Sequence, residues 1–411
     1  MSSLRILYHH RIRADDGQAV HVRELIGALR TAGQVVRECA LVPKAAAAAA
    51  STAAATSTAA ATPPRPGSAS TDGRPGFWQR LRLPRGAVEV LEVLYNQKGR
   101  RMLRKEAHTF APDVIYERHA LHCRAGLDVA RKLGVPLLLE VNSPMVDEME
   151  KLGSLRFPGR ARATERLVLS GADAVLAVTG VLAEMLVERG ARRDRVHVIP
   201  NGAVPERYGP VTQAASGSLR ARWQLDDAAF ALCFVGYMRP WHRLDFVIEA
   251  MQRPGMQDLV LVLIGKGPAL PELQQLAERK GLSNRLVICG EVPADLVPAH
   301  VMACDGALIP AINAYASPLK LFDSLAAGVP TLAPDQPNLR EYIEHGSHGL
   351  LFRPGDTDDL VAKLAQLVQN RPFARHLGRA GREQLVQQRW TWLGNAERVV
   401  QLADTLLASR R

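Results

Sequence analysis

The chain has 411 residues, of which 47% are hydrophobic and 23% are charged, and its net charge is +11. This length exceeds what one ordinary hydrophobic core supports, so we expect two domains. The longest apolar runs have the length of strands, which argues against a transmembrane helix. The five cysteines lack CxxC spacing, so the sequence indicates neither a zinc site nor a disulfide framework. The chain enters a strand pattern without an apolar leader, and we expect a cytoplasmic protein.

The positive charge has three interpretations. An arginine-rich, solvated surface explains it without any partner, and an anionic substrate or an anionic membrane surface explains it with one. Nucleic acid is disfavoured, because no basic and aromatic groove motif is present.

The first half of the chain alternates apolar runs with amphipathic patterns. The amphipathic segments predict helices over 20–31, 120–133 and 161–171. Continuous apolar strands between amphipathic helices predict a parallel sheet covered on both faces. The runs predict strands at 5–9, 35–41, 113–117, 136–141, 174–178 and 195–199.

The second half repeats this alternation. Strands are predicted at 230–235, 259–264, 286–289, 306–309, 331–333 and 350–352, and helices at 245–251, 269–280, 317–327, 358–370 and 375–388. The fold class is therefore α/β, with two Rossmann-like domains facing one another. In such folds ligands bind at the carboxyl ends of the strands, which here means the cleft between the domains.

One segment breaks the alternation. Residues 45–76 are a low-complexity run rich in alanine, serine and threonine, which predicts a disordered insertion. The segment 77–85, Phe-Trp-Gln-Arg-Leu-Arg-Leu-Pro-Arg, is both basic and apolar. It suits contact with an anionic membrane, or it is the start of a helix packed on the first domain.

The first strand is followed by a loop and a helix start. Gly17 and Gln18 lie where backbone can approach a substrate or a phosphate, and His21 is early enough in the helix to face the same side. A tight turn and a packing histidine are the alternative interpretation.

Three strands of the second half end in glycine. Gly236 is followed by Arg239, His242 and Arg243, and the guanidinium groups suit a diphosphate. Gly265 and Gly290 end the next two strands. Each loop alone is ordinary, but together they indicate a nucleotide site.

The segment 316–330 predicts a short helix with both ends defined. Ser317 is a good N-cap, Pro318 suits the first helical position, and Gly328 suits the left-handed residue after the last turn. A helix that starts at the end of a strand is a natural anion site, so we expect a phosphate at 317–320.

These motifs, in this order, resemble the family 4 glycosyltransferases. The resemblance rests on Val-Ile-Pro-Asn-Gly at 198–202, the glycine loops, the 317–332 segment and Gly-Leu-Leu-Phe at 349–352, and it covers nearly the whole chain except 45–86. Tyr-Glu-Arg at 116–118 and Glu-Val-Asn-Ser-Pro at 140–144 resemble a branch that builds bacterial glycans and glycoconjugates.

The resemblance implies a GT-B enzyme with two Rossmann-like domains, a retaining mechanism, a nucleotide-sugar donor and neither a cofactor nor a required metal. It implies an acceptor domain at 1–203, a donor domain at 204–388, and a C-terminal helix at 389–411 that returns to the first domain.

The resemblance also implies residue roles. The Gly236 loop and the 317–319 backbone would hold the diphosphate, the backbone near Val292 the base, and Asp323 the ribose. The candidate catalytic residues are His21, Asn142, Arg239 and Lys320. The candidate binding residues are Gly17, Gln18, Gly236, His242, Arg243, Gly265, Val292, Tyr315, Ser317, Pro318, Leu319 and Asp323.

The sequence departs from the family pattern at three places. Tyr315 replaces the glutamate that contacts the donor sugar, and Asn142 replaces a first-domain histidine. The family's basic pair falls on Tyr237 and His242, so Arg239 and Arg243 are expected to carry the charge instead. These changes indicate either a rebuilt or a lost active site, and the retained Ser-Pro-x-Lys start favours an active enzyme.

We therefore expect a glycosyltransferase that uses a UDP- or GDP-sugar and a glycan, lipid-linked or small-molecule acceptor, with peripheral contact to the inner face of the membrane as a further expectation. The alternatives are a GT-B nucleotide-sugar epimerase and a non-catalytic nucleotide-sugar-binding protein.

Overall fold

The computed structural model describes residues 3–14, 16–44 and 85–410. The predicted insertion at 45–76 and the segment 77–84 lie outside the described residues. The chain divides into two compact units. Unit 1 contains 1–176, 184–197 and 399–411, and unit 2 contains 177–183 and 198–398.

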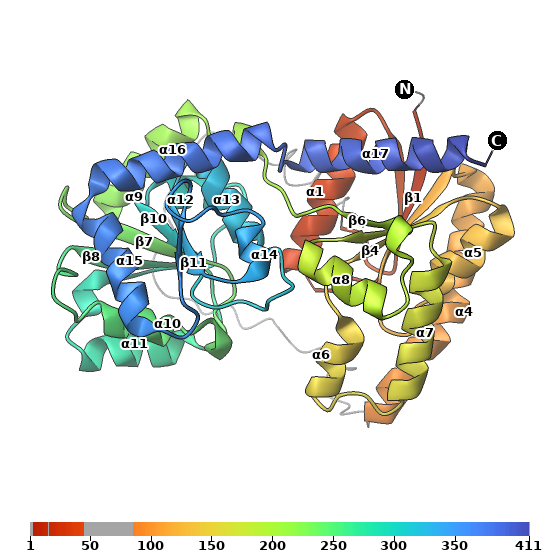
Figure 1. The fold of residues 1–411 in the computed structure, drawn as a ribbon, viewed down its shortest axis with the longest axis horizontal. Helices are drawn as coiled ribbons and strands as arrows, with labels where there is room; N and C mark the ends of the chain where they lie inside the picture. Colours follow the sequence, from red (N-terminus) through yellow and green to blue (C-terminus); the bar gives the residue numbers. More distant parts are fainter. Residues whose placement is uncertain (1–2, 15, 45–84, 411) are drawn as a thin grey trace, which may run out of the picture. The chain divides into compact units, whose positions relative to one another are not determined.

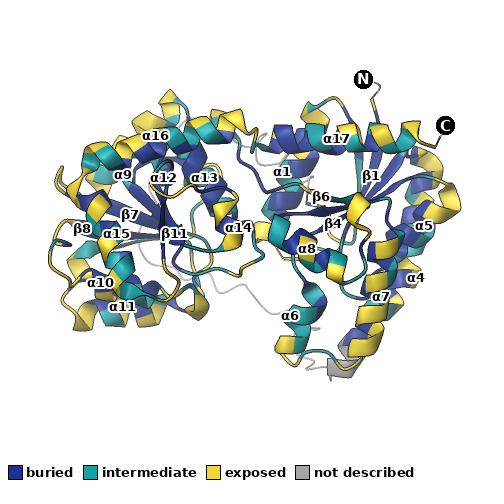
Figure 2. Ribbon diagram, in the orientation of Figure 1, coloured by how far each residue is buried: buried dark blue, intermediate teal, exposed yellow. Residues whose placement is uncertain are grey.

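Unit 1 is built on a six-stranded sheet of order β2-β1-β3-β4-β5-β6 (Figure 1). β1 pairs in parallel with both β2 and β3, and β3 pairs in parallel with β4. Every residue of β3 and β4 is buried, so both faces of the sheet are covered by other elements. Figure 2 shows the strands of this sheet mainly in the buried colour. The strands are β1 (Arg5–His10), β2 (Val35–Ala40), β3 (Val114–Arg118), β4 (Leu137–Val141), β5 (Ala174–Ala177) and β6 (Val196–Val198).

The helices between these strands include three for which the sequence analysis gave no range, at Arg85–Phe110, Met145–Lys151 and Gly180–Glu188. For the first of them it offered only the start of a helix, as one interpretation of 77–85. α4 runs for 26 residues between β2 and β3, directly after the undescribed segment. α1 begins at Gly17, earlier than predicted, because the Asp16 side chain caps it by accepting a hydrogen bond from the Gln18 amide at 3.0 Å. The helices are α1 (Gly17–Thr31), α4 (Arg85–Phe110), α5 (Ala125–Leu133), α6 (Met145–Lys151), α7 (Pro158–Gly171) and α8 (Gly180–Glu188), followed by a 3₁₀ turn at Arg193–Arg195.

Unit 2 has a second six-stranded sheet, of order β12-β11-β10-β7-β8-β9, whose pairings are all parallel. All six residues of β8 are buried. Leu259, Leu261 and Leu263 join the main core of the unit, and Val260, Val262 and Ile264 join a second cluster. The strands are β7 (Phe230–Val235), β8 (Leu259–Ile264), β9 (Leu286–Gly290), β10 (Gly306–Leu308), β11 (Thr331–Pro334) and β12 (Leu350–Phe352). The twelve predicted strands are thus all present.

The helices of unit 2 follow the predicted order, with α9, α12 and the short α14 as additions. They are α9 (Pro210–Arg222), α10 (Leu244–Ala250), α11 (Leu270–Arg279), α12 (Val297–Met302), α13 (Leu319–Ala327), α14 (Pro337–Arg340), α15 (Thr357–Gln369) and α16 (Arg371–Gln387), with 3₁₀ turns at Pro205–Tyr208, Pro240–His242 and Ser283–Arg285.

The predicted start of α13 is wrong by two residues. The helix begins at Leu319, and Pro318 has an extended backbone with ψ 126° instead of occupying the first helical position. Ser317 does not cap the helix, because Pro318 occupies the N-cap position, and the Ser317 hydroxyl instead accepts a hydrogen bond from the Asn201 amide at 3.2 Å. The predicted end is correct, since Gly328 is left-handed with φ 69°.

The last helix is α17 (Trp392–Ala408), and the residues from 399 onward group with unit 1. Arg410 donates hydrogen bonds there to the Gly134 carbonyl at 2.8 Å and to Asp173 at 2.6 Å. Within the described ranges, the helices are too short or too polar to cross a bilayer.

Candidate active site

The glycine-ended strands of unit 2 meet at one edge of its sheet, as predicted. The Gly236 amide donates to the Ile264 carbonyl at 2.9 Å, and the Gly265 amide donates to the Gly290 carbonyl at 2.8 Å. Gly236 and Gly265 have φ of 132° and 130°, which side-chain-bearing residues rarely adopt. A Cβ on Gly265 would overlap the carbonyl oxygen of Gly236. Glycine is therefore required for the two loops to approach this closely.

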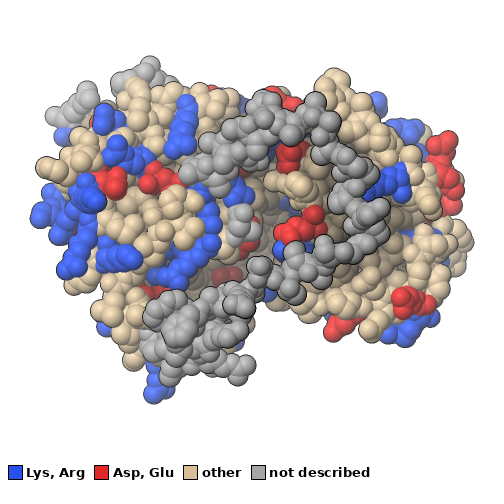
Figure 3. Space-filling model, turned by 180° about the vertical axis from the view of Figure 1, so that it is seen from behind, with Lys and Arg blue, Asp and Glu red and all other residues tan. Residues whose placement is uncertain are grey.

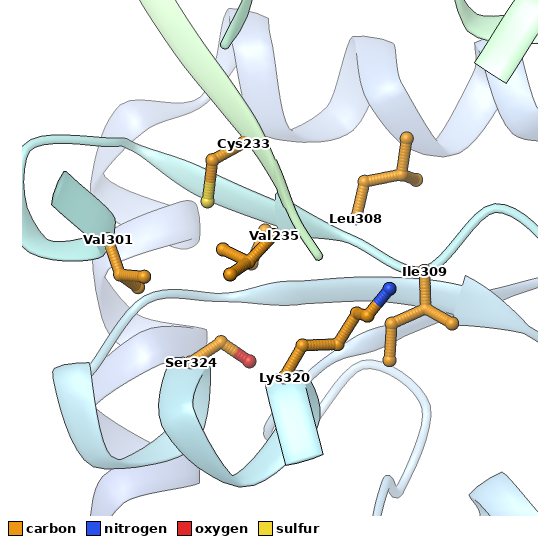
Figure 4. Close-up of a pocket in the computed structure, with 8 residues that line it drawn as sticks. Cys233, Val235, Val301, Leu308, Ile309, Lys320 and Ser324 are labelled. Carbon is orange, nitrogen blue, oxygen red and sulfur yellow. The ribbon is translucent and has the colours of Figure 1, made fainter. Parts of the chain in front are cut away.

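Lys320 extends from the first turn of α13 toward this edge. Its Nζ lies 3.8 Å from the centroid of the Phe234 ring. A Cβ built on Gly236 would lie 3.6 Å from the same Nζ, so the ammonium group sits directly against the Gly236 loop. In Figure 4 it lies among the side chains of a small, mainly apolar pocket. The pocket is lined by Cys233, Val235, Val301, Ala307, Leu308, Ile309, Lys320 and Ser324.

Burial in these surroundings lowers the pKa of Lys320 to about 7. In the part of the chain that the structure describes, no carboxylate forms an ion pair with its ammonium group. A half-buried cation without a counter-ion is unfavourable in the ligand-free protein, and an anion beside it would remove that penalty.

His242 adds a neutral group to the same loop. Its Nδ1 accepts a hydrogen bond from the Arg239 amide at 3.2 Å, which leaves the proton on Nε2. Burial, together with the charges of Lys320 and Arg239, lowers the pKa of His242 to about 4. The imidazole is therefore an uncharged hydrogen-bond donor at neutral pH.

The two arginines of this loop are held by their neighbours. The guanidinium carbon of Arg239 lies 4.8 Å from the ring centroids of both Tyr237 and Trp241. Arg243 pairs with Asp245 at 2.9 Å. Lys320, rather than either arginine, is the cation that lies against Gly236.

Other residues that were predicted to bind the nucleotide-sugar donor lie on α13 or just before it. The Asp323 carboxylate accepts a hydrogen bond from the Tyr208 hydroxyl at 2.9 Å. The Tyr315 hydroxyl accepts one from the Asn313 side chain at 2.9 Å. The backbone amides of Leu319 and Lys320 belong to the first turn of the helix, so they have no carbonyl partner within it. Val292 is half-buried in the loop after β9 and packs against the core.

In unit 1, the Glu140 carboxylate contacts both His21 and Asn142, two predicted site residues that the sequence could not show to be neighbours. Its buried carboxylate lies 3.0 Å from His21 Nε2 and accepts a hydrogen bond from the Asn142 side chain. Tyr116 donates to it at 2.7 Å, and Arg118 forms an ion pair with it. Burial alone would raise the pKa of Glu140, but the charges of His21 and Arg118 and these hydrogen bonds hold the pKa below its usual range.

Sequence reasoning missed Glu140 as a centre because the contacts come from α1, β3 and β4. The motif Glu-Val-Asn-Ser-Pro was the available signal, since it places a charged residue inside an apolar strand. Gly17 and Gln18, in contrast, are exposed at the first turn of α1.

A second buried cluster in unit 1 also lay outside the sequence prediction. His9 Nδ1 lies 2.6 Å from Glu117, and the Cys123 thiol donates to the same carboxylate oxygen at 3.7 Å. These three side chains have the chemistry and spacing of metal ligands. The carboxylate oxygen already accepts a third hydrogen bond, from the Gly126 amide at 2.9 Å, so the cluster is also satisfied as a hydrogen-bond network.

Two family models match most of the chain between them. The 4-like glycosyl transferase domain matches residues 16–202, and the group 1 glycosyl transferases match residues 217–384. The chain belongs to the family 4 glycosyltransferases. The family resemblance inferred from the motifs is therefore confirmed.

Two curated relatives are similar to this glycosyltransferase chain. A GDP-mannose-dependent alpha-(1-6)-phosphatidylinositol monomannoside mannosyltransferase of Mycobacterium tuberculosis is 26% identical over 240 residues, which is 56% of this chain and 62% of the relative. A D-inositol 3-phosphate glycosyltransferase of Nocardia farcinica is 28% identical over 292 residues, 67% of this chain and 64% of the relative. The chain spans less than two thirds of the length of each.

The solved structures confirm the GT-B fold. Sucrose-phosphate synthase of Thermosynechococcus elongatus is 19% identical with a TM-score of 0.72, and the alignment covers 99% of this chain and all of that one. Alr3699/HepE of Anabaena in complex with UDP is 16% identical with a TM-score of 0.68, covering 98% of this chain and all of that one. At these identities the likeness concerns the fold alone.

Proposed function

We propose that the protein is a retaining glycosyltransferase that moves a sugar from a UDP- or GDP-sugar to a glycan, lipid-linked or small-molecule acceptor. The observation that carries the proposal is the Lys320 ammonium group, which lies against the Gly236 loop without a carboxylate partner among the described residues. A diphosphate is the ligand that this cation and the first-turn amides of α13 would stabilise.

The same groups suit the departure of the nucleotide. As the bond between the sugar and the diphosphate breaks, negative charge accumulates on the leaving phosphate oxygen. Fixed donors at that oxygen are expected to be the largest catalytic effect, with about 3 kcal/mol lost when one such donor is removed. Lys320 supplies a charge, and neutral His242 supplies an N–H group that needs no deprotonation.

Binding of the diphosphate would restore the charge of Lys320. Because burial lowers the pKa of this lysine to about 7, a fraction of the ligand-free protein is neutral there at physiological pH. A phosphate beside Nζ favours the protonated form, so binding is accompanied by proton uptake.

Asp323 is proposed to hold the ribose and the backbone near Val292 the base. Asp323 has one carboxylate oxygen bonded to Tyr208 and is half-buried on α13. Tyr315 stands where the family has a sugar-contacting carboxylate, so the sugar would be recognised by a phenol instead. The similar Anabaena structure is a complex with UDP, and the mycobacterial relative is named as GDP-mannose-dependent. We propose that the donor of this protein is a UDP-sugar or a GDP-sugar.

Unit 1 is proposed to supply the acceptor side through His21 and Asn142. Both residues contact the Glu140 carboxylate, which is itself a poor nucleophile. It is buried, forms an ion pair with Arg118, and is held by His21, Asn142 and Tyr116. This favours same-side transfer without a covalent sugar–enzyme intermediate. The acceptor oxygen bonds to the anomeric carbon, the sugar–phosphate bond breaks, and the acceptor proton passes to the leaving phosphate.

We further propose that the reaction needs neither a metal ion nor a cofactor and takes place in the cytoplasm at the inner face of the membrane. The alternatives are an epimerase and a non-catalytic binding protein. Tyr315 and Asn142, which replace a glutamate and a histidine of the family pattern, are the observation that would favour the second of these.

The test is turnover of a donor panel by the purified protein. Product formation that requires both a UDP- or GDP-sugar and an acceptor, with the donor's anomeric configuration retained, supports the proposal. Isomerisation of the donor without an acceptor would instead establish an epimerase, and binding without any turnover would establish a non-catalytic protein.

A further inference from the structure

The outward side of α4 carries a continuous stripe of exposed apolar and basic side chains. Val90, Leu91 and Leu94 are 45%, 55% and 56% exposed, which is unusual for three large hydrophobic residues within five positions. At 100° per residue, the exposed basic residues of the following turns fall in the same sector of about 140°. They are Lys98, Arg101, Arg104 and Lys105. We call these seven residues the α4 stripe.

The opposite side of α4 explains why the stripe must face outward. Tyr95, Leu103 and Phe110 are buried, and Gly99 lets the helix lie close to Ala125 of α5. The packed face therefore fixes the rotation of the helix, and the stripe cannot turn into the core of unit 1.

The charge of the α4 stripe is not neutralised by its own helix. Glu89 is buried and pairs with His122, Glu92 pairs with Arg11, and Glu106 pairs with Arg37. Within the described part of the chain, the four basic side chains of the stripe form no ion pair, whereas the neighbouring Arg100 pairs with Asp128. Figure 3 shows Lys and Arg side chains gathered over the α4 side of unit 1.

We propose that the α4 stripe is the surface by which the protein docks on an anionic lipid bilayer. The pattern has the chemistry of an interfacial helix, with leucines that enter the headgroup boundary at one end and basic residues that meet anionic headgroups along the rest. Each basic side chain near such a surface strengthens binding by about fivefold. The inference rests on the proposed function, because a lipid-linked acceptor would be presented at such a surface.

The experiment is co-sedimentation of the full chain with vesicles of phosphatidylglycerol and phosphatidylcholine, compared with vesicles of phosphatidylcholine alone. Wild-type protein should bind the anionic vesicles, and high salt should weaken the binding. The double variant R101E/K105E should lose at least about tenfold in vesicle affinity.

The matched control is R375E/R379E on α16 of unit 2, where two exposed arginines have the same spacing of four residues. It changes the net charge equally and should retain binding much closer to that of the wild type. L91S/L94S tests the apolar end, and it should reduce binding even at high salt. Thermal unfolding of each variant shows that the fold is kept.

Three results would overturn the inference: absence of wild-type binding to anionic vesicles, equal losses in the two charge-reversal variants, or unchanged binding of R101E/K105E. Binding that appears only after deletion of residues 45–84 would also overturn it, because the chain's own segment would then cover the stripe. Turnover with a water-soluble acceptor separates this failure from failure of the proposed function, since R101E/K105E should keep that turnover.

Discussion

Lys320 is predicted to reduce the stability of the ligand-free protein, and the substitution Lys320→Met tests this directly. Methionine has a similar length and no charge, so it can keep the packing against Phe234 while removing the buried ammonium group. If the lysine is present for function, its removal should stabilise the fold and abolish the benefit of a bound diphosphate.

The magnitude follows from the pKa of Lys320, which burial lowers from 10.5 to about 7. At about 1.4 kcal/mol per pH unit, the charged side chain costs up to about 5 kcal/mol of folding free energy, and local relaxation will reduce this figure. The unfolded chain keeps its proton up to about pH 10.4, whereas the native protein loses it near pH 7. The penalty is therefore complete below pH 7 and is relieved as the pH rises from 7 toward 10.

The assay is urea unfolding of ligand-free wild-type and Lys320→Met protein across this pH range. We expect Lys320→Met to be more stable by at least about 1 kcal/mol at pH 6, which corresponds to about 2–4 °C in Tm for a domain of this size. The difference should shrink steadily toward pH 10. A variant that is less stable at pH 6, or a difference that does not change with pH, would refute the reasoning.

Three further predictions concern other parts of the site. Glu140→Gln should destabilise the protein by about 3–5 kcal/mol at pH 7, because it leaves the buried Arg118 without its counter-ion, and urea unfolding at pH 7 measures this loss. Asp323→Ala should weaken binding of UDP or GDP by about tenfold but leave inorganic pyrophosphate binding unchanged in calorimetry, because only the ribose contact is removed. Treatment with EDTA should leave turnover unchanged; loss of turnover that zinc restores would instead direct attention to His9, Glu117 and Cys123.

The two sheets could be predicted because parallel strands covered on both faces appear as continuous apolar runs. Every residue of β4 and β8 is buried, and these runs were read correctly. The course of α4 beyond its start was missed for the opposite reason. Its exposed leucines lie on the side of the helix that is expected to be polar, so they interrupt the amphipathic pattern. Leucines exposed in this way would be explained if that side of α4 is a functional surface.

The start of α13 shows what local motifs cannot specify. Ser317 and Pro318 have the residue types of an N-cap and a first helical position, but Asn201, 116 positions earlier, engages the serine hydroxyl. Glu140 is a similar case, because its partners come from three elements. Long-range hydrogen bonds of this kind leave no periodic signal in the sequence.

Lys320 was selected from the sequence for its place in the Ser-Pro-x-Lys segment, but its environment was not foreseen. The contacts with Phe234 and with the Gly236 loop depend on the close approach of α13 to the end of β7. The sequence therefore identified the residue, and the structure supplied the reason for its unusual pKa.

Calorimetric titration of UDP, GDP, UMP and GMP into wild-type and Lys320→Met protein tests the central claim most directly. Lys320 and the first turn of α13 are proposed to hold the second phosphate. For the base that the protein uses, the nucleoside diphosphate (UDP or GDP) should therefore bind the wild-type protein at least about tenfold more tightly than the matching monophosphate (UMP or GMP). This preference should decline above pH 7 and shrink in Lys320→Met, where only the first-turn amides of α13 remain. Equal binding of diphosphate and monophosphate, or an unchanged preference in the variant, would contradict the assignment of this site.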